Sequence, residues 1–104
     1  MTDTNIEKAD GPEGGRYIAR ISGIEDEGVL IYTHVSNGIV SADHTIVPET
    51  MAGRGVALAL LDFLLEDARN SGFRIVPVCK FVRSQYARHP EWKDLFVTAP
   101  GKDP

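Results

Sequence analysis

The chain has 104 residues, of which 42% are hydrophobic and 25% are charged, a composition typical of one soluble globular domain. Its net charge of −4 argues against a nucleic-acid-binding surface, which would carry an excess of lysine and arginine. A single cysteine excludes an intramolecular disulfide, and no stretch approaches the ~20 apolar residues of a membrane-spanning helix, so we expect a cytoplasmic protein with no membrane partner.

The two ends of the chain are polar, and we expect the folded domain to lie between them. Residues 1–15 are rich in Gly, Asp, Glu and Thr and are predicted to be a disordered leader. Residues 98–104 contain two prolines and a glycine and are predicted to fray. One folded domain is therefore predicted over residues 16–97.

Three segments after the leader have the side-chain patterns of strands. Residues 16–21 alternate between apolar and polar side chains, and residues 28–35 are rich in β-branched and aromatic side chains. Asn37-Gly38 is a strong signal for a tight hairpin turn, and residues 39–47 continue as the next strand. These segments predict a three-stranded antiparallel meander.

An amphipathic helix is predicted from about Arg54 to Asn70. Apolar side chains recur along one face at helical spacing, at Val56, Leu60, Phe63, Leu64 and Ala68, with Ala57 and Leu61 widening the face. Gly72 stands where a glycine commonly caps the C-terminal end of a helix.

A strand and a second helix are predicted after the first helix. The strand covers residues 73–78, and Pro77 marks a bulge, an edge or the strand end because it cannot donate a ladder hydrogen bond. The helix covers residues 81–88 and ends near Pro90, and residues 91–96 add one or two further turns.

This order of elements, β-β-β-α-β-α, predicts an α+β fold with two main helices. The sheet is expected to be mixed, with the antiparallel meander extended by one parallel strand after the crossover helix. In open sheets of this kind, ligands bind beyond the carboxyl ends of the parallel strands. We therefore expect a cleft where the strand over residues 39–47 ends.

A glycine turn, Gly53-Arg54-Gly55, leads from that strand end into the first helix. Glycines let the backbone bend and approach a ligand closely, and a helix N-terminus offers free amides and a positive dipole end to a phosphate. The P-loop and dinucleotide-binding patterns are absent. The turn is then either a phosphate-binding loop of another kind or a helix-capping turn without a ligand.

The turn resembles the pyrophosphate-binding loop of the GCN5-related N-acetyltransferases, which reads Gln/Arg-x-x-Gly-x-Gly/Ala at the start of the same helix. Gly55 and Ala57 match the last two positions, whereas Ala52 departs from the first. Two further segments are similar to a small, single-domain, YjdJ-like subgroup of that superfamily: His44-Thr45-x-Val47-Pro48 and Pro77-x-Cys79-x-x-Val82-x-x-Tyr86-x-x-His89-Pro90. The resemblance covers residues 17–96 and implies a minimal version of the superfamily fold.

The resemblance implies that acetyl-CoA is the co-substrate and that CoA is released. Backbone amides at the loop would bind the pyrophosphate, at Gly53, Arg54, Gly55, Val56 and Ala57. A backbone N–H near Ile46 or Val47 would stabilise the carbonyl oxyanion. The acceptor is expected to be an amine, either a small molecule or a lysine side chain of a protein.

Three residues are candidates for the chemistry. Cys79, at the end of a strand and before a helix, is either a transient acyl acceptor near the thioester or a small buried packing residue. The resemblance implies that Tyr86 protonates the departing CoA thiolate, unless it is a core aromatic. His44 would accept the proton of the attacking amine near neutral pH, unless it is a polar strand residue.

Two functions follow for the whole chain, beside a third possibility, an interaction domain that has lost its ligand. The first is an N-acetyltransferase that moves an acetyl group from acetyl-CoA to an unidentified amine, directly or through Cys79. The alternative is a non-catalytic CoA- or acyl-CoA-binding module, because no final β-hairpin that would shape an acceptor pocket is evident. The three histidines lack the ligand spacing of a metal site, so no metal is expected.

Overall fold

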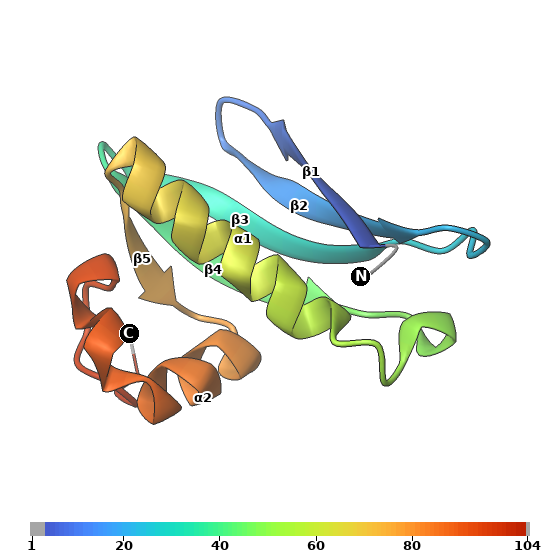
Figure 1. Cartoon of the computed structure of the whole chain (residues 1–104). Coiled ribbons are helices and arrows are strands. Elements are labelled where there is room, and N and C mark those ends of the chain that lie inside the picture. Colours follow the sequence, from blue (N-terminus) through green and yellow to red (C-terminus); the bar gives the residue numbers. More distant parts are fainter. Residues whose placement is uncertain (1–3, 104) are drawn as a thin grey trace.

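The computed structural model describes residues 4–103, which form one five-stranded sheet with helices packed against it (Figure 1). The strands follow the chain in the order β1-β2-β3-β4-β5, with bounds Thr4–Asp10, Gly14–Ile21, Gly28–Ser36, Ile39–Ile46 and Arg74–Pro77. Strands β1 to β4 pair antiparallel, and β5 pairs parallel to β4. The predicted α+β fold with a mixed sheet is confirmed, with one strand more than predicted.

Two α-helices and two short 3-10 helices complete the domain. Helix α1 (Val56–Ser71) connects β4 to β5, and α2 (Lys80–Arg88) follows β5. The 3-10 segments are Glu49–Met51 and Pro90–Leu95. Helix α1 begins two residues later than predicted, because Gly55 has the left-handed backbone conformation of a cap, and Gly72 caps its other end as predicted.

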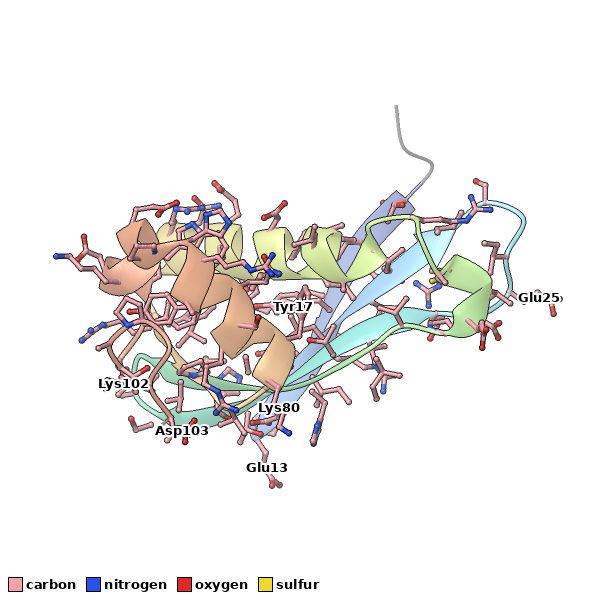
Figure 2. All side chains as sticks on the ribbon, turned by 90° about the horizontal axis from the view of Figure 1, so that it is seen from below. Glu13, Tyr17, Glu25, Lys80, Lys102 and Asp103 are labelled. Atoms are coloured by element: carbon pink, nitrogen blue, oxygen red, sulfur yellow. The ribbon has the colours of Figure 1, made fainter. Side chains whose placement is uncertain are left out.

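The core lies between one face of the sheet and the two helices. Helix α1 buries Val56, Leu60, Leu61, Leu64, Leu65 and Ala68. Phe63, predicted on this face, instead lies at its margin with 36% of its surface exposed, and packs against Tyr17. Helix α2 adds Val82 and Tyr86 to the same core. Among residues 4–103, no helix covers the opposite face of the sheet (Figure 2).

The predicted disordered leader is wrong for residues 4–15. Residues Thr4–Asp10 form β1, which pairs along its whole length with β2, and β2 itself begins at Gly14. The glycines that suggested disorder allow close backbone approach: a Cβ on Gly15 would lie 2.2 Å from the carbonyl oxygen of Ala9. Residues 1–3 lie outside the described part of the chain.

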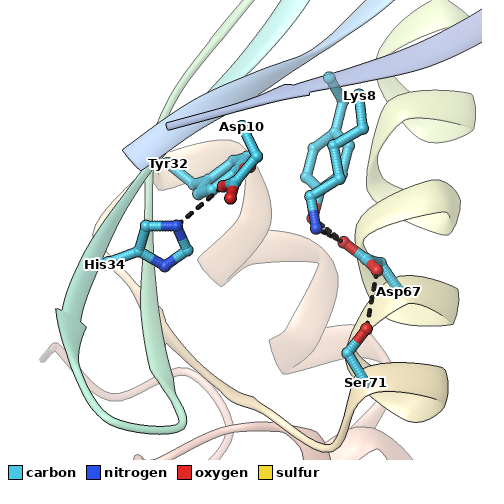
Figure 3. A network of polar contacts seen from close by, with 7 residues as sticks. Lys8, Asp10, Tyr32, His34, Asp67 and Ser71 are labelled. Atoms are coloured by element: carbon cyan, nitrogen blue, oxygen red, sulfur yellow. Dashed lines mark hydrogen bonds and ion pairs between the residues drawn. The ribbon is translucent and has the colours of Figure 1, made fainter. Parts of the chain in front are cut away.

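Polar side chains tie β1 to the rest of the domain (Figure 3). The ammonium of Lys8 lies 2.7 Å from the carboxylate of Asp67 on α1, which also accepts a 2.7 Å hydrogen bond from the buried Tyr17 hydroxyl. Asp10 accepts a 2.5 Å hydrogen bond from the Tyr32 hydroxyl and pairs with His34 at 2.8 Å. These partners lie far from β1 in the sequence. Their contacts hold the polar strand β1 in the folded domain.

The predicted frayed tail also differs from the structure over residues 98–103. The carbonyl oxygen of Thr98 accepts a 2.6 Å hydrogen bond from the Tyr86 hydroxyl, and Asp103 lies 3.2 Å from the Arg83 guanidinium. A turn between them is closed by a hydrogen bond from the Lys102 amide to the Ala99 carbonyl. The tail is therefore held against α2, and residue 104 lies outside the described residues.

Candidate active site

The parallel strands β4 and β5 separate part of the way along β4. They pair from Ile39 opposite Arg74 to Ala42 opposite Pro77, and β5 ends there. The amide of Cys79 then donates a 2.7 Å hydrogen bond to the Ala42 carbonyl as the chain turns into α2. Of the three roles that the sequence left open for Pro77, a bulge, an edge or a strand end, the structure shows the strand end, because Pro77 is the last residue of β5. Beyond this point β4 continues without a partner on the β5 side.

A cleft of about 440 Å³ opens where the two strands separate. One wall is the free end of β4 and the other is the segment from β5 into α2. The cleft is lined by Asp43, His44, Thr45, Ile46, Val78, Cys79, Lys80 and Phe81. Its position matches the expectation that ligands bind beyond the carboxyl ends of parallel strands.

A β-bulge sets the directions of the side chains on the β4 wall. Ile31 of β3 lies opposite His44 and Tyr32 lies opposite Ala42, so Asp43 is an extra residue on β4. Cross-strand partners share a face of a sheet. His44 therefore lies on the uncovered face with Ile31, whereas Thr45, opposite the buried Leu30, lies on the helix-covered face. The cleft thus has wall residues from both faces of the sheet.

Cys79 is the N-cap residue of α2, and its side chain is 9% exposed. Its sulfur lies 3.4 Å from the hydroxyl oxygen of Thr45 on the facing wall. The residue is therefore both a packed core residue and part of the cleft lining.

Tyr86 does not line the cleft. Its side chain is fully buried, its ring stacks on Phe96 with centroids 4.0 Å apart, and its hydroxyl donates to Thr98. Burial raises the pKa of Tyr86 above the ordinary value, so the group stays protonated at neutral pH. These contacts place Tyr86 in the core beside the C-terminal segment, away from the cleft lining.

The predicted phosphate loop lies at the same end of the sheet as the cleft, because it connects the end of β4 to the start of α1. Gly53 and Gly55 both have positive φ angles, of 76° and 72°. The first turn of α1 is apolar, and no described side chain caps its N-terminus by a hydrogen bond. The amides of this turn, including those of Val56 and Ala57, are therefore available to an anion.

The predicted site residues divide into three groups. His44, Ile46 and Cys79 line one cleft, and Val47 follows Ile46 directly along the chain. Gly53, Arg54, Gly55, Val56 and Ala57 lie on the neighbouring loop and helix start, and Tyr86 lies in the core.

Sequence reasoning missed Asp43, Thr45 and Lys80 as cleft residues. The bulge that turns Asp43 and His44 to one face leaves no mark in the alternation of the sequence. Lys80 had a usable signal, because it follows the cysteine at a strand-to-helix junction, where cleft residues gather.

Two classes of feature are not found in the described part of the chain. No group of three or more His, Cys, Asp or Glu side chains within residues 4–103 is placed to hold a metal ion. None of the helices described is long and apolar enough to cross a membrane.

Comparison with known proteins identifies the family. Residues 16–95 match the model of the GCN5-related N-acetyltransferase family. The chain is 33% identical over 82 residues to Protein NATD1 of Gallus gallus, covering 71% of this chain and 74% of that protein. It is 35% and 33% identical over 72 residues to Protein NATD1 of Bos taurus and of Homo sapiens, and spans 64% of the length of each. Because the family match extends from β2 through the second 3-10 helix, the chain belongs to the GCN5-related N-acetyltransferase family.

Proposed function

We propose that this protein is an N-acetyltransferase that transfers the acetyl group of acetyl-CoA to an amine. The observation that carries the proposal is the cleft between β4 and the start of α2, which brings His44 and Cys79 together in a chain that belongs to an acetyltransferase family. The YjdJ-like subgroup remains a prediction from the sequence.

Acetyl-CoA would bind with its pyrophosphate at the loop and its pantetheine arm along β4. The amides of Gly53, Arg54, Gly55, Val56 and Ala57 would donate to the phosphate oxygens. The arm is a partly apolar chain, and Ile46 and Val78, 54% and 43% exposed, give the cleft apolar walls for it. An amide at Ile46 or Val47 would donate to the carbonyl oxygen as it gains negative charge.

In direct transfer, the amine loses a proton and its nitrogen attacks the thioester carbonyl carbon. The C–N bond forms, the C–S bond breaks, and the thiolate leaves and takes a proton from solvent in the open cleft. His44 lies on the uncovered face of the sheet and lines the cleft, which suits the group that accepts the amine proton. In the two-step variant, the Cys79 thiol gives its proton to solvent, its sulfur attacks the acetyl carbonyl carbon, and CoA leaves as the thiolate and is protonated by solvent. The amine then attacks the acetyl-Cys79 thioester and loses a proton, and the Cys79 sulfur leaves as a thiolate that is protonated by solvent.

A comparison of Cys79→Ala with His44→Gln tests the route. If transfer is direct, Cys79→Ala keeps its acetyl-transfer rate within about twofold, and no acetyl adduct accumulates on the wild-type protein without an amine. If transfer passes through the cysteine, the variant loses turnover and mass spectrometry of the wild type finds an adduct of about 42 Da on Cys79, the mass added by one acetyl group. His44→Gln is expected to slow turnover about 100-fold on either route.

The position of Tyr86 favours a second candidate, a non-catalytic CoA- or acyl-CoA-binding module. With Tyr86 bonded to Thr98, no tyrosine among the described residues lines the cleft to protonate the departing sulfur. Thermal unfolding with and without acetyl-CoA separates the candidates. A raised Tm without turnover on any amine would favour the module, and no change in Tm at millimolar acetyl-CoA would reject both.

A further inference from the structure

Asp43 is a fixed carboxylate in the wall of the cleft. It is the extra residue of the β4 bulge, and its carboxylate contacts the hydroxyls of Thr33 and Ser41, which are cross-strand partners on the uncovered face of the sheet. The Thr33 hydroxyl donates to one of its oxygens at 2.6 Å, and the Ser41 hydroxyl donates to the other at 2.7 Å. Two hydroxyl donors on two adjacent strands hold the carboxylate in one orientation.

The charge of Asp43 has no cationic partner among the ion pairs of the described residues. The two hydroxyls use two of the roughly four lone-pair sites of a carboxylate, so both oxygens retain acceptor capacity. Hydroxyl donors supply hydrogen bonds but no positive charge. A partly buried carboxylate in this state favours a cation that brings its own N–H donors.

The position of Asp43 beside His44 matters for the reaction. Both residues lie on the uncovered face and both line the cleft, whereas Thr45 lies on the helix-covered face. No helix within residues 4–103 covers this face, so a bulky acceptor meets no obstacle from a second layer (Figure 2). An amine that approaches from the uncovered face meets Asp43 and His44 before it reaches the wall of the cleft that contains Cys79.

We propose that Asp43 is the anionic subsite that binds the ammonium group of the acceptor and so selects alkylammonium acceptors over uncharged amines. The inference rests on the proposed function, since it names the class of amine that enters the same cleft. The carboxylate binds the alkylammonium, the ammonium passes one proton to His44, and the neutral nitrogen attacks the thioester carbonyl carbon. As the C–S bond breaks, CoA leaves as the thiolate and takes a proton from solvent, and the new amide nitrogen loses its second proton to solvent. Asp43 gains no proton in this sequence; it positions the nitrogen and contributes to substrate binding.

The test compares Asp43→Asn, which keeps the side-chain shape, with the wild type on three amines. Spermidine and a short lysine-containing peptide are alkylammonium ions at pH 7, and an arylamine is uncharged. The expected result is a KM about tenfold higher for the two cations, with kcat and the arylamine KM nearly unchanged. Equal loss on all three amines, or no loss on any, would overturn the proposal. The ratio between spermidine and the peptide identifies whether small or protein-borne ammonium groups are preferred.

Two controls separate charge from structure. Thr33→Val with Ser41→Ala keeps the carboxylate and removes the two hydroxyls, so it should raise the KM for cations much less than Asp43→Asn does. Asp26→Asn removes a carboxylate that also accepts a hydroxyl bond, at 2.7 Å from Thr50, but lies outside the cleft lining. Asp26→Asn should leave every KM unchanged. If it raised the KM for the cations as much as Asp43→Asn does, the effect would come from the net charge of the protein and not from Asp43, and the proposal would be overturned.

A binding measurement keeps the inference separate from catalysis. Spermidine and the lysine peptide are titrated calorimetrically into the wild type and Asp43→Asn, each saturated with CoA. If no amine is turned over but both cations bind the wild type and not the variant, the proposed enzyme activity fails and the cation subsite stands. If both proteins bind the cations equally, the subsite fails whatever the activity.

Discussion

The hydroxyl oxygen of Thr45 lies 3.4 Å from the sulfur of Cys79, a contact between the free end of β4 and the start of α2. The two residues are 34 positions apart in sequence and face each other across the point where the parallel strands separate. The thiol is therefore positioned by both walls of the cleft. A ligand that enters between β4 and α2 must change the exposure of Cys79.

Alkylation of Cys79 is expected to report on occupancy of the cleft. Because the side chain is 9% exposed and lines the cleft, iodoacetamide should modify it slowly, and saturating CoA should slow the reaction at least about threefold further. Intact-mass measurement over time gives both rates. In urea-unfolded protein, CoA should have no effect. Equal rates with and without bound CoA in the native protein would place the ligand elsewhere.

Gly55→Ala is expected to weaken acetyl-CoA binding beyond its effect on stability. Gly55 has φ 72° and an added Cβ meets no atom within 4 Å, so the cost is backbone strain of about 1 kcal/mol in the free energy of unfolding. The same strain would distort the amides offered to the pyrophosphate, and we expect an increase in Kd of about tenfold. Calorimetric titration and urea unfolding measure the two quantities.

Gly72→Ala is the matched control for this change. Gly72 has φ 80°, also with open space around an added Cβ, but caps the opposite end of α1. It should lose similar stability and bind acetyl-CoA with unchanged affinity. If both variants lose affinity equally, the loop has no special role.

Tyr86→Phe is expected to lower stability and leave catalysis nearly unchanged. The change removes the hydrogen bond to the Thr98 carbonyl, which costs about 1 kcal/mol in the free energy of unfolding. Turnover at saturating substrate should stay within about twofold, since the hydroxyl does not line the cleft. If turnover instead falls about 100-fold while stability is unchanged, the Tyr86 hydroxyl would be the group that protonates the departing CoA thiolate.

Lys8→Ala is expected to loosen β1 without unfolding the domain. The change removes the ion pair with Asp67 and the ammonium that lies about 6 Å from the rings of Tyr17, Tyr32 and Phe73. Backbone amides of β1 should exchange hydrogen about tenfold faster, while those shared by β3 and β4 should not change. Lys8→Arg, which keeps the charge, should retain most of the protection, and equal exchange in both variants would show that the charge is unimportant.

Low pH is expected to weaken the contacts that hold β1 in the domain. The Tyr32 and His34 side chains lower the pKa of Asp10 below its ordinary value of 3.8. Burial opposes ionisation of Asp67, but the hydrogen bonds from Lys8 and Tyr17 outweigh it and also lower that pKa below 3.8. Because both carboxyls bind protons more weakly in the folded state, their stabilisation is present above about pH 4 and is lost as the pH falls through the folded-state values.

Urea unfolding at pH 7 and pH 3 measures this effect. Stability should fall between the two, and the double variant Asp10→Asn with Asp67→Asn should be less stable at pH 7 but lose less on acidification. If the double variant loses as much stability as the wild type between these pH values, the acid sensitivity comes from other carboxyl groups.

The elements whose side chains alternate at a clear period were predictable from the sequence. The hairpin turn at Asn37-Gly38, the apolar face of α1 with its Gly72 cap, and the strand end at Pro77 depend on neighbours within a few positions. Local sterics and burial of one face dictate these features, so a single sequence contains them. The family resemblance likewise rested on short segments in a given order, and the comparison confirmed it.

Tertiary structure alone decided the features that depend on distant partners. Strand β1 is polar by composition, yet Lys8 and Asp10 find their partners 59 and 24 positions away, on α1 and β3. The bulge at Asp43 and the burial of Tyr86 against Phe96 arise in the same way, from pairing and packing that no local pattern encodes. The sequence by itself determined the protein family and the co-substrate to expect. Contacts across the fold decided which side chains line the cleft, because the role of a polar group depends on the groups that lie next to it in the folded chain.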